Sequence, residues 1–156
     1  MRAAGFVASY FDAWNQADAG GVADHLTRNG TYCDIPLNQQ LTRKALVANL
    51  EDFFSHEHSR YDMVGEALSS ETTIAFQYRV TPLDSRSGKP VGSPWFGAEF
   101  MNIDCVAAVR IADYYEISAD SENPARTTSS VSASTKYAVP GWASRRWETI
   151  RNDWAY

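Results

Sequence analysis

Residues 10–36 read YFDAWNQADAGGVADHLTRNGTYCDIP, and this stretch decides the fold. It begins inside a helix that we predict over residues 3–17, because apolar side chains recur there at helical spacing while polar ones take the other side. Such a helix packs its apolar side against a core. That side is formed by Phe6, Val7, Tyr10, Phe11 and Trp14.

The middle of the same stretch leads the chain from helices into a sheet. Two glycines at 20–21 break the first helix, and a short second helix is predicted over residues 22–26. The Asn-Gly pair at 29–30 predicts a turn. Residues 31–35 follow as a predicted strand, which Pro36 ends. The order helix, helix, strand is therefore expected.

The next segment predicts a third helix. Its apolar residues again fall at helical spacing, and Thr42 precedes them as a suitable N-cap. The run His-Glu-His at 56–58 follows and is expected to be a solvated turn. We expect no metal there, because two histidines two residues apart share a face only on a strand and no third ligand is evident. The apolar stripe is formed by Leu46, Val47, Leu50, Phe53 and Phe54.

Beyond residue 61 the apolar residues recur at every second position, which is typical of half-buried strands. Residues 85–93 are rich in Gly, Ser and Pro and predict an exposed hairpin loop. Two further strands are predicted over residues 95–106 and 109–119. The clearest alternation is formed by Ile74, Phe76, Tyr78 and Val80.

Helices on one face of such a sheet predict an α+β fold. We expect a roll over residues 1–120, in which a curved antiparallel sheet packs on three helices and encloses a cone-shaped pocket. Residues 121–135 are rich in Ser and Thr and read as a linker. The aromatic and basic remainder of 121–156, with a candidate helix over 144–154, is expected to pack back on the domain or on a partner subunit.

The composition narrows the function. The chain has 156 residues, 44% of them hydrophobic, and a formal net charge of −5. An acidic chain without a basic stripe argues against nucleic-acid binding. No apolar run reaches the length of a membrane span, and none near the N-terminus reads as a signal peptide. Two cysteines are too few for a disulfide framework. We therefore expect a cytoplasmic protein without nucleic-acid or membrane partners.

The element order, together with residues 10–36, resembles the nuclear transport factor 2-like (NTF2-like) superfamily, which shares a cystatin-like roll. Within it the chain looks most similar to ketosteroid isomerase and the SnoaL-like polyketide cyclases. The similarity covers roughly residues 3–120. Tyr10 matches an oxyanion-hole tyrosine on the first helix, and Asp34 matches a general-base aspartate at the family's spacing. In this sequence Ile35 separates that aspartate from the proline that usually follows it directly.

The resemblance implies further site residues. Asp104 lies near the family's second, protonated aspartate, and Asp120 matches the acid/base aspartate of the polyketide cyclases in position. Because Asp104 shares a predicted strand face with two phenylalanines, we expect that face to line the pocket. The expected substrate-binding residues are Trp14, Phe54, Phe96, Phe100 and Asp120.

The chemistry that these residues would support is proton abstraction next to a carbonyl. A carboxylate such as Asp34 takes the proton, and donors such as Tyr10 and a neutral Asp104 stabilise the charge that develops on oxygen. We therefore expect an acid/base enzyme of isomerase, cyclase or dehydratase type that acts on a small apolar carbonyl compound without a cofactor. A non-catalytic ligand-binding or protein-interaction module and a sensor domain are the alternatives.

A homodimer is also expected. Sheets in this superfamily commonly pair across their outer faces, and three apolar residues share one face of the strand predicted over 95–106. Glu99 interrupts that face. We take it as the outer face, which would need covering. The three residues are Trp95, Met101 and Ile103.

Overall fold

The computed structural model describes residues 3–115, and the structural findings below concern that part of the chain. It contains three helices and six strands. The helices are α1 (Ala3–Asn15), α2 (Ala19–Asp24) and α3 (Arg43–His56). The strands are β1 (Leu26–Asp34), β2 (Gln39–Thr42), β3 (Ser59–Ser69), β4 (Thr73–Pro82), β5 (Trp95–Asp104) and β6 (Ala107–Tyr115).

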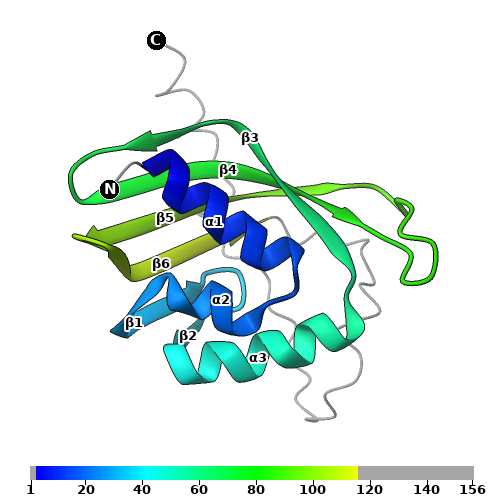
Figure 1. The fold of residues 1–156 in the computed structure, drawn as a ribbon, viewed down its shortest axis with the longest axis horizontal. Coiled ribbons are helices and arrows are strands. Elements are labelled where there is room, and N and C mark those ends of the chain that lie inside the picture. The colour runs from blue at the N-terminus through cyan, green and yellow to red at the C-terminus, as the bar shows by residue number, and fades with distance from the viewer. Residues whose placement is uncertain (1–2, 116–156) are drawn as a thin grey trace. The chain divides into compact units, whose positions relative to one another are not determined.

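The strands form one sheet in the order β2-β1-β6-β5-β4-β3. All neighbours are antiparallel except β1 and β6, which run parallel. The sheet is curved, and the three helices pack on its concave face (Figure 1). A break in register between Val64 and Leu68 contains Gly65, whose φ of 72° suits glycine. Such irregularities bend a strand. The predicted α+β roll is confirmed.

The core lies between the helices and the concave face of the sheet. The apolar side of α1 is buried, as its spacing predicted, and Tyr10 is only 1% exposed. On β4 the alternation places Ile74, Phe76, Tyr78 and Val80 inside. Helix α3 begins after Thr42, whose hydroxyl accepts a hydrogen bond from the Ala45 N–H. In each of these elements, the residues that the apolar spacing assigns to one side are the ones that the structure buries fully or in part.

The helix break predicted at residues 20–21 and the turn predicted at residues 29–30 are not formed by these glycines. Gly20 and Gly21 lie inside α2, where the Asp18 carboxylate caps the helix by accepting from the Gly21 N–H at 2.8 Å. The Asn-Gly pair at 29–30 lies within β1, beside a break in register with β6. A Cβ at Gly30 would lie 2.8 Å from the Ala108 carbonyl oxygen. Glycine is used there for close approach of two strands rather than for a turn.

Five element ends meet at one end of the roll. Because β1 and β6 run parallel while β5 is antiparallel to β6, Asp34, Tyr115 and Trp95 lie at the same end of the sheet. The pairing of β5 with β4 and of β4 with β3 brings Pro82 and Ser59 to that end as well. We call this the open end, because its residues are half-buried rather than fully buried.

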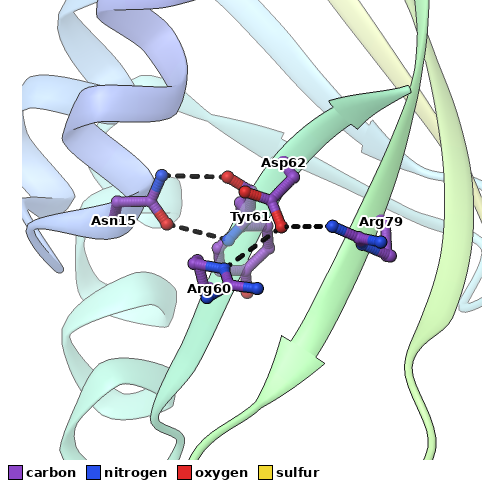
Figure 2. A network of polar contacts seen from close by, with 5 residues as sticks. All are labelled: Asn15, Arg60, Tyr61, Asp62 and Arg79. Carbon is purple, nitrogen blue, oxygen red and sulfur yellow. Dashed lines mark hydrogen bonds and ion pairs between the residues drawn. The ribbon is translucent and has the colours of Figure 1, made fainter. Parts of the chain in front are cut away.

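Helix α1 is fixed to β3 at the open end. The Asn15 side-chain amide donates to the Tyr61 carbonyl oxygen at 2.9 Å and accepts from the Tyr61 N–H at 2.8 Å. Next along β3, the Asp62 carboxylate accepts from Arg60 and Arg79 at 3.2 and 3.0 Å (Figure 2). The amide of Asn15 thus pairs with β3 as a peptide group of another strand would. This contact sets the position of the last turn of α1.

Candidate functional site

Three carboxyl groups lie in register across the centre of the sheet. Asp34 on β1 pairs with Asp113 on β6, and Asp113 pairs with Glu99 on β5. Their burial increases along this line, from half-buried Asp34 to Asp113 at 7% and Glu99 at 3% exposure. We call these three residues the acid row. Carboxyl groups so close together and so buried do not all ionise at neutral pH.

Four tyrosine hydroxyls donate to the acid row. Tyr32 and Tyr78 each donate to one oxygen of Asp113, both at 2.7 Å. Tyr10 on α1 donates to Glu99 Oε1 at 3.2 Å. Tyr115 donates to Asp34, at 3.1 Å to Oδ1 and 2.9 Å to Oδ2. The sheet and the first helix therefore supply a hydroxyl to every member of the row.

Burial, together with the negative charge of Asp34, raises the pKa of Asp113 to about 7, although hydrogen bonds from Tyr78 and Tyr32 oppose the rise. Burial and the charge of Asp113 likewise raise the pKa of Glu99 well above its usual value. Glu99 Oε2 is buried and has no hydrogen-bond partner among the described residues. The row thus combines two buried carboxyl groups with raised pKa values, Asp113 and Glu99, with the half-buried Asp34, whose negative charge acts on Asp113.

Gly97 makes room for part of this network. It lies on β5 opposite Tyr78 of β4, and a Cβ at Gly97 would lie 2.3 Å from both Cζ and Oη of Tyr78. The tyrosine ring therefore crosses the strand over a missing side chain. This is how the Tyr78 hydroxyl reaches Asp113.

Asp34 is held at the open end by backbone as well as by Tyr115. Its Oδ1 accepts from the Leu37 N–H at 3.0 Å, which fixes the turn after β1. The Tyr115 ring packs on Trp95 with ring centroids 5.5 Å apart, and Trp95 packs on Tyr78 at 6.0 Å. A chain of three aromatic rings, Tyr115, Trp95 and Tyr78, thus lies beside the half-buried end of the acid row.

Two cavities lie beside α1 and β3. One of about 160 Å³ is at the open end, between the last turns of α1 and α3 and the start of β3. The other, about 340 Å³, is a groove between α1 and β3 that includes Phe11, Asp12 and Met63. Tyr61 lines both cavities. Neither is lined by a residue of the acid row.

The structure separates two residues that were expected to converge. The Tyr10 hydroxyl contacts Glu99, whereas Asp34 contacts Tyr115. Tyr10 is fully packed and lines neither cavity. The acid row connects the two residues, with Asp113 between them. The expected roles of Tyr10 as donor and Asp34 as base on one substrate require the two side chains to meet in one pocket, and they do not.

The prediction of which face of β5 points into the core is also wrong. Phe96 and Phe100 are 55% and 38% exposed and lie on the convex face of the sheet. Asp104, which has the same parity, is exposed at the hairpin before β6, at the end of the sheet opposite Asp34. The opposite face, expected to be outside, packs into the core, with Met101 at 0% exposure. A strand with apolar residues on both faces gave no unique choice of orientation.

Other expected site residues are placed as follows. Trp14 and Phe54 line the 160 Å³ cavity, so their role in binding stays a prediction. Asp120, the linker and the C-terminal extension lie outside the described residues. Sequence reasoning missed Glu99 and Asp113 as site residues. The sequence did hold a signal for both residues, because each is an acidic residue inside a predicted strand. Glu99 also lies on the same strand face as the apolar Met101.

Comparison with solved structures gives the fold. A proposed polyketide cyclase from Xanthomonas campestris superposes with a TM-score of 0.61 at 20% identity, covering 74% of this chain and 90% of that one. A protein with a ketosteroid isomerase-like fold from Catenulispora acidiphila, solved in complex with trimethylamine, superposes with a TM-score of 0.62 at 14% identity, covering 72% and 86%.

The chain has the NTF2-like fold. A proposed polyketide cyclase from Pseudomonas putida agrees, with a TM-score of 0.59 at 21% identity over 75% of this chain and 93% of that one. The resemblance inferred from residues 10–36 is confirmed at the level of the fold. No protein-family model and no curated protein matches the sequence. Fold alone does not decide the activity of an NTF2-like chain.

Two further observations bear on partners. None of the helices within residues 3–115 is long and apolar enough to cross a bilayer. In the same part of the chain, no three His, Cys, Asp or Glu side chains are grouped as a metal site requires.

Proposed function

We propose that this NTF2-like chain is an acid/base enzyme that acts on a small, mostly apolar carbonyl compound at the open end of the acid row. The observation that carries the proposal is the pairing of Asp34 with Asp113 across β1 and β6. Two carboxyl groups in register, one half-buried and one fully buried, differ in their tendency to ionise. Because of this difference, Asp34 is the group of the pair that can act as the base.

In the proposed reaction Asp34 removes a proton from the carbon next to the carbonyl. The C–H electron pair forms the enolate, and Asp34 then returns the proton to another carbon, so that isomerisation needs no co-reactant. The Tyr115 hydroxyl, at 2.9 Å from Asp34 Oδ2, is the donor nearest the base. The hydrogen bond that this hydroxyl donates would shift from the carboxylate to the carbonyl oxygen of the substrate as negative charge develops on that oxygen.

The buried part of the row has a supporting role in this proposal. The pKa of Asp113 is about 7, so this carboxyl group keeps its proton below that pH. A neutral Asp113 keeps negative charge from accumulating beside Asp34. Tyr10 holds Glu99 through its hydroxyl. Tyr10 is thus proposed as a positioning residue rather than as the oxyanion donor that the resemblance implied.

The solved neighbours are consistent with a small-molecule ligand. The protein from Catenulispora acidiphila carries trimethylamine, and other neighbours are proposed polyketide cyclases. At these identities their names transfer no activity, but they support a search among small organic compounds.

Replacing Asp34 by Asn is expected to lower turnover about 100-fold, since a positioned carboxylate base contributes at least about that factor. We would assay cyclic β,γ-unsaturated ketones and follow the absorbance of the conjugated product. Asp52→Asn on the exposed side of α3 is the matched control and should leave turnover unchanged. Turnover by Asp34→Asn equal to that of the unmutated chain would remove Asp34 from the mechanism.

A non-catalytic ligand-binding module is the second candidate, and one observation favours it. Tyr10, Glu99 and Asp113 are packed, and neither of the two cavities is lined by them. A chain that binds a compound at the open end, but converts none of the ketones, would be a module of this kind. Binding measurements on the same compounds separate the two candidates.

We also propose a homodimer, now through the convex face that carries Phe96 and Phe100. The Phe100 ring packs edge-on against Tyr114 with centroids 5.6 Å apart, so this face presents aromatic surface to a partner. Phe96→Arg is expected to turn a dimer into a monomer in gel filtration at micromolar concentration. Met63→Arg, on the exposed edge strand β3, is the control, and elution of the unmutated chain as a monomer would contradict the proposal.

A further inference from the structure

The 160 Å³ cavity at the open end is walled by aromatic rings. Four aromatic residues line it. The Trp14 ring contacts three of them, with centroid distances of 6.5 Å to Phe53, 5.6 Å to Phe54 and 4.8 Å to Tyr61. The phenylalanine rings pack on each other at 5.7 Å. We call these four residues the aromatic cage. A cavity of about 150 Å³ holds a molecule the size of benzene, so this one suits a small ligand or one end of a larger one.

One carboxylate lies at the cage. It belongs to Glu57; the other ionisable side chains that line the cavity are His58 and Tyr61, and no Lys or Arg lines it. No ion pair is formed by Glu57 within residues 3–115. Burial raises the pKa of the Glu57 carboxyl, and the neighbouring histidines His58 and His56 only oppose this rise. The pocket therefore holds a partly buried acid without a fixed cation beside it.

Two helices end at the cage, which adds to its negative potential. Trp14 and Asn15 belong to the last turn of α1, and Phe53 and Phe54 to the last turns of α3, followed by Glu57 as its C-cap. The C-terminus of a helix carries a partial negative charge that favours cations within its last turn. Both helices are long enough for this effect, and both present that end to one cavity.

The cage is held in place by contacts outside it. The amide of Asn15 pairs with the backbone of Tyr61 (Figure 2). This pairing fixes Trp14, the residue before Asn15 on α1, relative to the Tyr61 ring on β3. The Glu57 N–H donates to the Phe53 carbonyl oxygen at 2.9 Å, which fixes the end of α3. The rings therefore need little ordering when a ligand binds, and a preformed site loses less entropy.

We propose that the aromatic cage binds a small organic cation, an alkylated ammonium group, with Glu57 as its counter-ion. Ring faces attract such a cation electrostatically, and the helix ends and the carboxylate add attraction of the same sign. A neutral apolar group would gain from the rings alone. The proposal goes beyond the acid/base function and does not require it, because binding at the cage involves no residue of the acid row.

The test uses two probes of the same shape on the full chain. Choline carries the charge, and 3,3-dimethylbutan-1-ol is its neutral analogue. We expect choline to bind about tenfold more tightly, measured by NMR titration of the Trp14 indole resonance, since a partly desolvated cation–π contact contributes about that factor. Equal affinity for both probes, or no shift of the resonance with either, would overturn the proposal.

Matched variants locate the binding. Phe53→Leu and Glu57→Gln should each weaken choline about threefold to tenfold and leave the neutral probe nearly unchanged. Glu51→Gln on the exposed side of α3 should change neither affinity. Weakening by this control variant to the same extent would place the cation elsewhere. Because the readout is binding, failure here leaves the turnover test of Asp34 unaffected.

Discussion

The free energy of unfolding is expected to fall by about 4 kcal/mol as the pH rises from about 4 to about 7. The cause is Asp113, whose pKa burial raises to about 7, whereas in the unfolded chain it is about 3.9. Each unit of difference corresponds to about 1.4 kcal/mol. Burial and the charge of Asp113 also raise the pKa of Glu99, which adds to the fall with the same sign.

The direction follows from which state binds more protons. Below about pH 4 both states carry the proton, and the full contribution of Asp113 to stability is present. Between about pH 4 and pH 7 the folded state retains a proton that the unfolded state has released, so stability falls with rising pH. Above about pH 7 both states have lost it and the contribution is gone. The contribution of Asp113 to stability is therefore largest in acid.

Urea denaturation between pH 4.5 and 8 measures this slope. Asp113→Asn should reduce the slope to the part that Glu99 contributes, whatever the variant does to absolute stability, whereas Asp52→Asn on exposed α3 should keep the full slope. A carbon-13 titration of the Asp113 carboxyl by NMR gives the pKa independently of unfolding. A stability that rises between pH 4.5 and 7 would show that Asp113 is ionised in the folded protein.

Substituting Gly97 by Ala is expected to destabilise the protein by about 3 kcal/mol. A Cβ there would lie 2.3 Å from the Tyr78 ring, which is only 3% exposed and has little room to move. Overpacking of a core costs about 1–3 kcal/mol. Displacing the ring also breaks the 2.7 Å hydrogen bond to Asp113, and a buried polar group left without its partner costs about as much again.

Two variants test the cause. Gly5 lies exposed in α1, and no atom lies within 4 Å of the position that an added methyl group would take, so Gly5→Ala should stabilise by about 0.5–1 kcal/mol. In a Tyr78→Ala background, Gly97→Ala should cost nearly nothing, because the clash is gone. Chemical denaturation gives all four free energies of this double-mutant cycle. A cost that persists in that background would point to the backbone rather than to Tyr78.

Local sequence determined much of the fold. The apolar side of α1, the stripe of α3 after Thr42 and the alternation along β4 each predicted the element that formed. These patterns are read from neighbours in the chain, because helical and strand periods repeat over a few residues. The order of the elements then indicated the α+β roll, and the solved neighbours share it.

Tertiary structure alone decided the orientation of β5 and with it the composition of the site. Apolar residues occur on both faces of β5, so the two-residue period fitted either choice, and the face that carries the buried Glu99 was taken as the outer face. Pairing with β6 brings Asp113 beside Glu99, and packing of α1 brings Tyr10 to it. These partners lie far apart in the chain, so no local pattern records that three acids and four tyrosines meet.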